Sequence, residues 1–211
     1  MRKTKAEAAR TREALMQGAL KCFDRKGIAG STLDEIAAAA GVTKGALYWH
    51  FDGKRSIFNA LRKCVSLPIL DRADVTLLHD GEGDALDRVG RFLLGMLQAL
   101  EKDKAMRTSL GVMHFKCEFV GELEGELESA RANTSQLVKA FARAYAQAKR
   151  EGSLAPGIAP RDAAVETMMF FTGMLRLWLL DAGPVRRGAA AAIRAHVHSK
   201  RALPARTSPR K

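Results

Sequence analysis

The chain has 211 residues and a hydrophobic fraction of 47%, which is enough to bury a sizeable core without disulfides or structural metals. Its formal net charge of +12 gathers at the two ends: residues 1–65 contribute +7, residues 66–185 contribute −3 and residues 186–211 contribute +8. Basic ends favour a polyanionic partner, although solubility charge and a loose basic tail explain them equally well.

Cysteine usage and hydropathy exclude several classes of protein. Cys22, Cys64 and Cys117 are odd in number and lie at no metal-ligand spacing, so we expect neither a disulfide framework nor a metal site. A reducing cytoplasm is the natural compartment for such a chain. The most apolar segment, residues 163–180, is interrupted by Glu166 and Arg176 and is too short between charges to span a bilayer. No apolar stretch follows the basic start, so no signal peptide and no membrane partner are expected.

The first predicted helix begins after Thr4, because Thr4 and Glu7 have the spacing of a capping box. Leu15, Ala19 and Phe23 then recur every four residues and form one apolar stripe. Gly27 ends this helix.

Two short helices follow in residues 31–51. Thr32 and Glu35 repeat the capping-box spacing, and Gly41 stops the helix they begin after about two turns. Thr43 caps the next short helix, which ends before Asp52-Gly53, and a longer helix begins near Lys54. A capped helix, a tight glycine-containing turn and a second short helix are typical of a helix-turn-helix.

The outward face of the second short helix carries residues suited to DNA. Gly45 is costly inside a helix and makes sense if the backbone there approaches DNA closely. Lys44 and Lys54 flank the helix as candidate partners for phosphates. An ordinary helical hairpin with a chance surface is the alternative. The outward set is Thr43, Lys44, Gly45, Tyr48, Trp49 and His50.

Beyond Pro68 the pattern changes to longer helices, which we expect near residues 83–102, 105–116, 121–151, 160–182 and 188–200. The alternating glutamates between Glu122 and Glu128 predict a solvated acidic helix start. The fold expected from these elements is all-α. A helix-turn-helix domain occupies residues 1–65, a larger helical domain residues 66–200, and a basic disordered tail residues 201–211.

Residues 4–61 resemble the N-terminal DNA-binding domain of the TetR family. The resemblance is carried by Thr32, by Ile36, by the run from Ala39 to Val42, and by residues 44–51 with Lys54. Residues 110–121 and 173–180 are similar to the AcrR/TtgR group of that family, which represses multidrug efflux pumps.

The resemblance implies an N-terminal three-helix DNA-binding domain and a larger C-terminal domain for ligand binding and dimerisation. Such a homodimer binds a palindromic operator on double-stranded DNA and leaves it when a small apolar or aromatic inducer enters the C-terminal domain. The residues that would face DNA are Thr32, Thr43, Lys44, Gly45, Tyr48, Trp49, His50 and Lys54. Those that would line the ligand cavity are Val89, Leu93, Met96, Leu110, His114, Met168, Phe171, Thr172 and Arg176.

Several of these residues have a plain structural interpretation as well. A lone His114 on an apolar helix is often a satisfied core residue. A buried Arg176 must be paired, with Glu166 or Asp181 as candidate partners. Cys117 is expected to be a buried thiol, because only Lys116 is placed to lower its pKa.

The expected dimer forms through the last two long helices, with Trp178, Leu179 and Leu180 facing the small residues 189–193. Catalysis is not expected, because the sequence contains no nucleophile–base motif, no phosphate-cradling glycine loop and no paired metal ligands, and it implies no cofactor. Two alternatives stay open, an architectural DNA-binding protein without operator choice and an activator of the same family.

Overall fold

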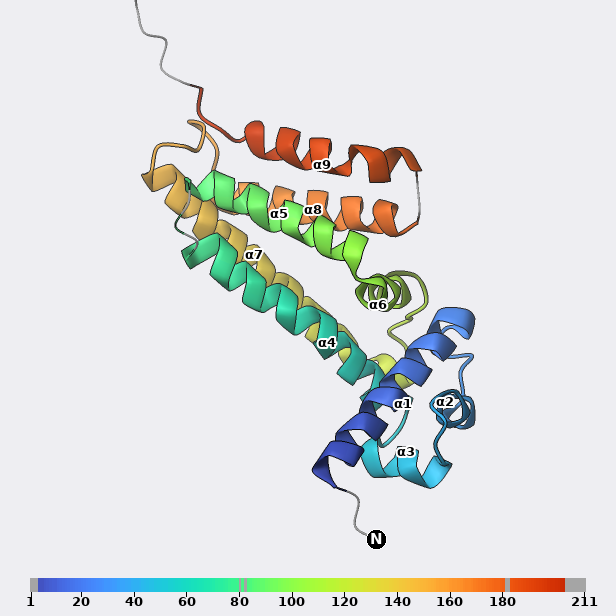
Figure 1. The fold of residues 1–211 in the computed structure, drawn as a ribbon. Helices are drawn as coiled ribbons and strands as arrows, with labels where there is room; N and C mark the ends of the chain where they lie inside the picture. Colours follow the sequence, from blue (N-terminus) through green and yellow to red (C-terminus); the bar gives the residue numbers. More distant parts are fainter. Residues whose placement is uncertain (1–3, 80, 82, 181–182, 204–211) are drawn as a thin grey trace, which may run out of the picture. The chain divides into compact units, whose positions relative to one another are not determined.

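The computed structural model describes residues 4–79, 81, 83–180 and 183–203, and these residues are mainly helical (Figure 1). Within these ranges, Leu154 and Arg201 form an isolated antiparallel β-bridge. The prediction of an all-α fold is confirmed. None of the helices in the described ranges is long and apolar enough to cross a membrane. Most of the expected tail, residues 204–211, lies outside these ranges.

The chain divides into two compact units. The first comprises the chain up to Pro68 together with Leu100–Ala132, and the second comprises Ile69–Ala99 and the chain from Asn133 onward. The sequence pattern suggested one boundary between residues 65 and 66, whereas the structure groups the segment 100–132 with the N-terminal part. The reason is packing between residues far apart in the chain, which local patterns do not record.

The first unit contains the helix-turn-helix. Its elements are α1 (Lys5–Lys26), α2 (Leu33–Ala39), α3 (Lys44–His50), the beginning of α4 (Lys54–Asp74), α6 (Lys104–Phe115), the 3-10 turn η2 (Gly121–Leu123) and the beginning of α7 (Glu126–Arg150). The capping box at Thr4 forms as expected, and α1 ends at Gly27 with a φ of 73°.

The core of the first unit combines the helix-turn-helix with the segment 100–132. Phe23, Ile36 and Leu47 are fully inaccessible to solvent, and Val112 of α6 and Leu123 of η2 belong to the same cluster. Gly18 allows the close crossing of α1 and α2, because a Cβ there would lie 2.9 Å from the Ile36 carbonyl oxygen. Because α6 shares this core, it helps to hold α2 and α3 in place.

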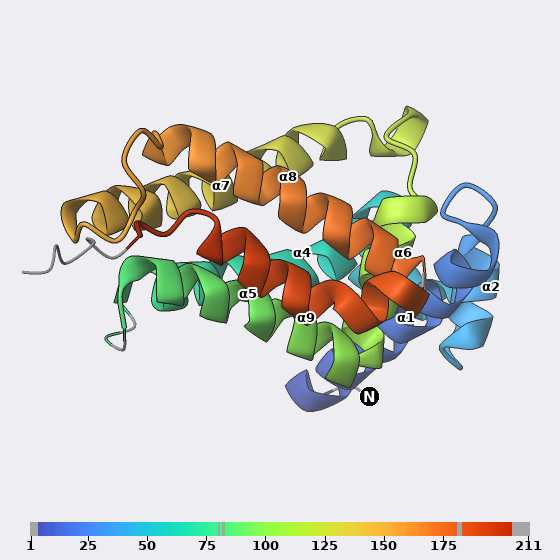
Figure 2. The same cartoon turned by 90° about the horizontal axis from the view of Figure 1, so that it is seen from above.

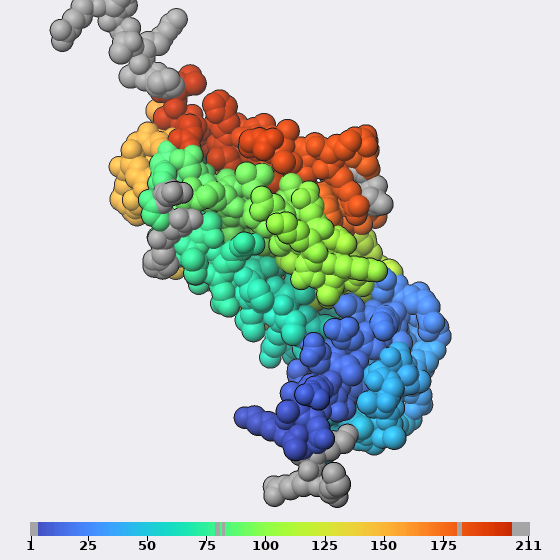
Figure 3. Space-filling model, in the orientation of Figure 1, coloured from blue at the N-terminus to red at the C-terminus, as the bar shows by residue number. Residues whose placement is uncertain are grey.

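The second unit contains the end of α4, the π-helical turn η1 (Val75–His79), most of α5 (Ala85–Lys102), most of α7, α8 (Pro160–Leu179) and α9 (Gly183–His198). α4 continues through Pro68, where the sequence pattern suggested a change, and ends at Asp74. α9 lies alongside α8 and α5 (Figures 1 and 2). The space-filling view shows α9, in red, covering one side of this unit beside the green α5 (Figure 3).

Aromatic side chains and one polar chain of hydrogen bonds fill the centre of the second unit. Phe92 meets Phe141 edge-on, with ring centroids 5.6 Å apart. The Tyr145 hydroxyl lies 2.7 Å from Thr167 Oγ1, which lies 2.9 Å from His196 Nε2. α7, α8 and α9 are therefore joined by side-chain bonds inside an otherwise apolar core.

The last described residues are tied to this unit. Lys200 is buried and pairs with Glu166 of α8, and Arg201 pairs with Asp84 and with Asp87, whose carboxylate lies 2.6 Å away. Arg201, which the sequence pattern assigned to the disordered tail, thus takes part in the folded unit.

Candidate nucleic-acid interface

Side-chain caps set the geometry of the helix-turn-helix. Thr32 Oγ1 accepts a hydrogen bond from the Glu35 amide at 3.2 Å, and the Glu35 carboxylate accepts one from the Thr32 amide at 3.1 Å. Gly41 turns the chain with a φ of 67°, and Thr43 Oγ1 then accepts from the Ala46 amide at 3.2 Å. α2 and α3 therefore begin where the sequence spacing placed them.

One face of α3 is anchored in the core and the other is open. Leu47 is fully buried and Phe51 is 4% exposed, whereas Tyr48 is 51% and Trp49 72% exposed. The rings of Trp49 and His50 meet edge-on, with centroids 4.5 Å apart. Large exposed aromatics on a short, well-anchored helix are suited to contact with another molecule.

Two ion pairs join α2 to its neighbours, one to α3 and one to α1. The Lys44 ammonium lies 2.9 Å from the Asp34 carboxylate of α2, and this carboxylate raises the pKa of Lys44. Lys26 pairs with Glu35, and the hydrogen bond from Lys26 lowers the pKa of that carboxyl. All four groups are solvent-screened, so the pairs orient side chains more than they stabilise the fold.

Gly45 has no packing role inside the protein. A Cβ built at this position would meet only Thr43 Oγ1, at 4.0 Å, and the residue is exposed. Among the described residues, packing therefore gives no reason for a glycine at this position.

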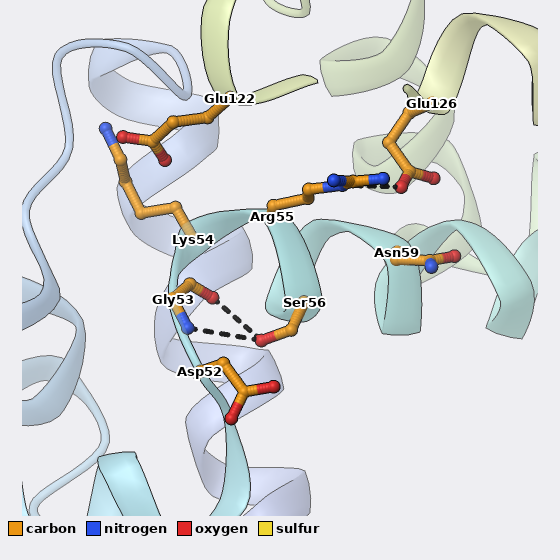
Figure 4. Close-up of a pocket in the computed structure, with 8 residues that line it drawn as sticks. All are labelled: Asp52, Gly53, Lys54, Arg55, Ser56, Asn59, Glu122 and Glu126. Atoms are coloured by element: carbon orange, nitrogen blue, oxygen red, sulfur yellow. Dashed lines mark hydrogen bonds and ion pairs between the residues drawn. The ribbon is translucent and has the colours of Figure 1, made fainter. Parts of the chain in front are cut away.

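Lys54 begins α4 but does not simply point into solvent. Its ammonium donates to the backbone carbonyls of Ile28 and Ala29, at 3.2 and 3.4 Å. In the close-up Lys54 extends toward Glu122, and Ser56 bonds back to both backbone groups of Gly53 (Figure 4). The cation expected to meet phosphate thus also connects the start of α4 to the loop after α1.

A charged cluster that the sequence interpretation missed lies beside this helix start. Glu126, expected in a solvated acidic helix start, is 2% exposed and pairs with Arg55 and Arg62 of α4. That expectation is wrong for Glu126. No local signal separates Glu126 from Glu124 and Glu128, because its partners lie more than 60 positions away in the chain.

The residues expected to line a ligand cavity fall into both units. Val89, Leu93 and Met96 of α5 and Phe171 of α8 are buried in the second unit. Thr172 and Arg176 lie on exposed positions of α8, and Met168 is half-buried. Leu110 and His114 of α6 belong to the first unit. The lining set therefore stays a prediction.

Two plain interpretations can be compared with the structure. Arg176 is exposed, so its expected burial is wrong. Of its two candidate partners, Glu166 pairs with Lys200, and Asp181 lies outside the described residues. Cys117 is partly buried against the core of the first unit, and burial raises the pKa of its thiol to about 11. A protonated, packed thiol agrees with the structural role expected for it.

α2 and α3 are both capped, are joined by a tight turn at Gly41, and leave one face of α3 exposed. This arrangement defines a helix-turn-helix DNA-binding protein. The family description "Bacterial regulatory proteins, tetR family" matches residues 15–61, and "MAATS-type transcriptional repressor, C-terminal region" matches residues 84–191. The chain belongs to the TetR family of transcriptional regulators, whose members are regulators and not enzymes.

Individual relatives agree with this assignment. The HTH-type transcriptional regulator TtgR of Pseudomonas putida is 32% identical over 187 residues, which covers 85% of each chain. The structure of NalD, the secondary repressor of the MexAB-OprM multidrug efflux pump in Pseudomonas aeruginosa, is 28% identical, with a TM-score of 0.82 over 92% of this chain and 98% of NalD. The SmeT–triclosan complex shares the fold at 22% identity, with a TM-score of 0.80 over 95% of this chain and 98% of SmeT.

Proposed function

We propose that this chain is a dimeric repressor that binds a palindromic operator through α3 and is released by a small apolar or aromatic inducer. The observation that carries the proposal is the two-sided character of α3. Leu47 fastens one side to the core, while Tyr48 and Trp49 stand open on the other. A short helix of this kind can enter the major groove with its exposed side chains against the base edges.

The neighbouring groups support the same face. Thr43 and Lys44 begin α3, Gly45 leaves its backbone uncovered, and Thr32 begins α2. Hydroxyls and ammonium groups at helix starts are suited to phosphate oxygens. Lys44, already oriented by Asp34, and Lys54, at the start of α4, supply the cations that a phosphate backbone needs.

Tyr48→Ala tests the DNA face directly. Duplexes selected from a random pool by the wild-type protein supply the operator, and its dissociation constant is measured at fixed salt. Because Tyr48 is half exposed, we expect the variant to fold normally and to bind the operator about 5- to 100-fold more weakly. Asp71→Ala, at an exposed position of α4, is a control that should leave binding unchanged. Unchanged operator affinity in Tyr48→Ala contradicts the proposal, and equal affinity of the wild type for all duplexes indicates an architectural protein.

The inducer site is proposed in the apolar interior formed by α5 and α8. Val89, Leu93, Met96 and Phe171 present hydrocarbon, sulfur and an aromatic ring, which favours planar apolar ligands over charged ones. Linkage then requires that an inducer preferring the released state weakens operator binding, typically by 1–3 kcal/mol.

The two tryptophans allow this site to be tested. Trp178 is buried in the second unit and Trp49 is exposed in the first, so a Trp49→Phe variant reports on Trp178 alone. We expect members of a panel of antibiotics, flavonoids, dyes and triclosan to change its fluorescence and to release operator from the wild-type protein. A panel without binders, or binders that leave operator affinity unchanged, contradicts the inducer proposal.

The regulated genes are proposed to encode a multidrug efflux pump, with the repressor itself in the cytoplasm. The support is the similarity to TtgR and to NalD, whose description names such a pump. Loss of the gene should then raise the transcript of an efflux operon. Lowered transcript instead indicates an activator.

A further inference from the structure

Glu126 is a buried carboxylate beside the start of α4. It is the first residue of α7 and is 2% exposed. Its two oxygens receive Arg55 Nε at 3.1 Å and an Arg62 terminal nitrogen at 3.3 Å. Arg62 is itself buried and also donates to Asn59 Oδ1 at 2.8 Å. One carboxylate therefore holds two arginines that lie two turns apart on α4.

The chain just before Glu126 is shaped around Arg55. A Cβ at Gly125 would lie 2.6 Å from an Arg55 terminal nitrogen, so the guanidinium occupies the space that a side chain would fill. In Figure 4, Arg55 extends from the first turn of α4 to Glu126, with their ion pair drawn as a dashed line. Gly125 and Glu126 together form a seat for this one side chain.

The first turn of α4 is the part of the helix that the DNA proposal uses. It carries Lys54, and it follows the buried end of α3, Phe51, after Asp52 and Gly53. Arg55 directly follows Lys54 in this turn, so a side-chain contact that anchors Arg55 also restrains the backbone that carries Lys54. A phosphate contact needs that placement to within a fraction of an ångström to keep its hydrogen bonds.

A purely electrostatic argument predicts that Glu126 weakens DNA binding. A carboxylate near a DNA-binding surface repels the phosphates, so its removal should strengthen DNA binding if charge alone mattered. A buried ion pair is also weak evidence for stability, because desolvation cancels much of its Coulomb energy. A carboxylate in this place is better explained by the geometry that it imposes on its two arginines.

We propose that Glu126 is a positioning residue for operator binding. Through Arg55 and Arg62 it holds the first turn of α4 in a fixed position relative to α3. The inference rests on the proposed function, since it concerns the DNA face of the same unit. It assigns a DNA-binding role to a residue outside the helix-turn-helix and inside the region matched by the C-terminal family description.

The charge-neutral variant Glu126→Gln distinguishes positioning from charge. Its matched control is Glu128→Gln, which removes the same charge two residues later in α7, where the carboxylate is exposed and pairs only loosely with Arg131 at 3.6 Å. We expect Glu126→Gln to weaken operator binding at least 10-fold and to lower the salt dependence of binding by about one ionic contact. Glu128→Gln should bind as tightly as the wild type or slightly more tightly.

A second variant keeps the proposal testable if Glu126→Gln does not fold. Gly125→Ala retains every charge and displaces only the Arg55 guanidinium, and we expect it to weaken operator binding about 3-fold or more. Affinity for an unrelated duplex should fall by a similar factor, because the contact that is lost is made to a phosphate, which every duplex presents. Operator binding equal to wild type in folded Glu126→Gln, or in Gly125→Ala, overturns the proposal. A wild-type protein that prefers no duplex contradicts the proposed function instead.

Discussion

Gly45 is an exposed residue within α3 whose missing side chain benefits no contact inside the protein. Replacement by alanine should raise the free energy of unfolding by up to about 1 kcal/mol, because alanine is the better helix former. The same change should weaken operator binding at least 5-fold, because the new methyl group separates α3 from the DNA. Urea unfolding and binding anisotropy measure the two effects on one sample.

The control for this substitution is Gly111→Ala. Gly111 lies within α6, and a Cβ at this position meets nothing within 4 Å. The control should gain stability and keep its operator affinity. A Gly45→Ala variant that gains stability without losing affinity shows that the DNA does not approach this backbone.

Lys54 shows how one side chain can serve two purposes. Its ammonium donates to two backbone carbonyls after α1, so Lys54→Ala leaves the Ile28 and Ala29 oxygens without this donor. We expect the free energy of unfolding to fall by about 1 kcal/mol, in addition to the loss of DNA affinity expected from the missing charge.

Lys63→Ala is the control that separates the loss of a charge from the loss of the carbonyl contacts. Lys63 is exposed on the same helix, so its replacement removes an equal charge from α4. This control should keep the wild-type urea midpoint. If Lys54→Ala and Lys63→Ala unfold at the same urea concentration, the carbonyl contacts contribute nothing measurable.

At the scale of the elements, α7, α8 and α9 meet at His196. The ring of Phe170 is stacked on the imidazole at 4.3 Å, Thr167 bonds its Nε2, and Lys200 and Glu166 are the charged groups near it. Burial lowers the pKa of His196 below its ordinary value of 6.5, Lys200 lowers it further, and Glu166 opposes both. The folded protein therefore binds a proton at His196 less tightly than the unfolded chain does.

This arrangement predicts a stability that depends on pH. Because the unfolded chain takes up the proton at higher pH than the folded chain does, the full stability is present above pH 6.5 and declines as the pH falls below that value. Urea midpoints between pH 8 and pH 5 measure the decline. His196→Asn should flatten it, whereas His198→Asn, at an exposed position of α9, should not. An equally steep decline in His196→Asn assigns the effect to another group.

At the scale of the whole molecule, α8 and its C-cap residue, Leu180, carry an exposed apolar stripe. Val165, Met169 and Leu180 recur at helical spacing and are 44%, 70% and 57% exposed. Trp178, Ala189 and Ile193, which the sequence pattern directed at a partner, are instead buried within the chain. We expect a dimer through α8 and α9, which would cover the stripe; to bind a palindromic operator, a two-fold dimer needs its two reading helices about one DNA turn, 34–36 Å, apart.

Met169→Arg tests this dimer. A buried, unpaired cation at a two-fold interface is strongly unfavourable, so the variant should be monomeric at micromolar concentration and bind the operator at least 10-fold more weakly. Val75→Arg introduces the same charge at an exposed apolar position of η1 and should stay dimeric. Sedimentation velocity distinguishes the two. A monomeric wild type, or a dimeric Met169→Arg, contradicts the interface.

The sequence by itself determined the helix-turn-helix, because its causes are local. The caps at Thr32 and Thr43 act over three residues, and the apolar spacing of Leu47 and Phe51 acts over one turn. The exposure of Tyr48 and Trp49 follows once Leu47 faces the core. The caps and the apolar spacing that predict this part of the interface all lie within residues 32–51.

Only the tertiary structure decided the rest, because the contacts concerned join residues far apart in the chain. Glu126 meets Arg55 across 71 positions, Arg201 meets Asp84 across 117, and the Lys54 ammonium reaches the Ile28 carbonyl across 26. Burial of Glu126 depends on what packs over the first turn of α7, and exposure of Arg176 depends on which side of α8 its neighbours cover. Local periodicity describes a helix face, but it does not state which distant element covers that face.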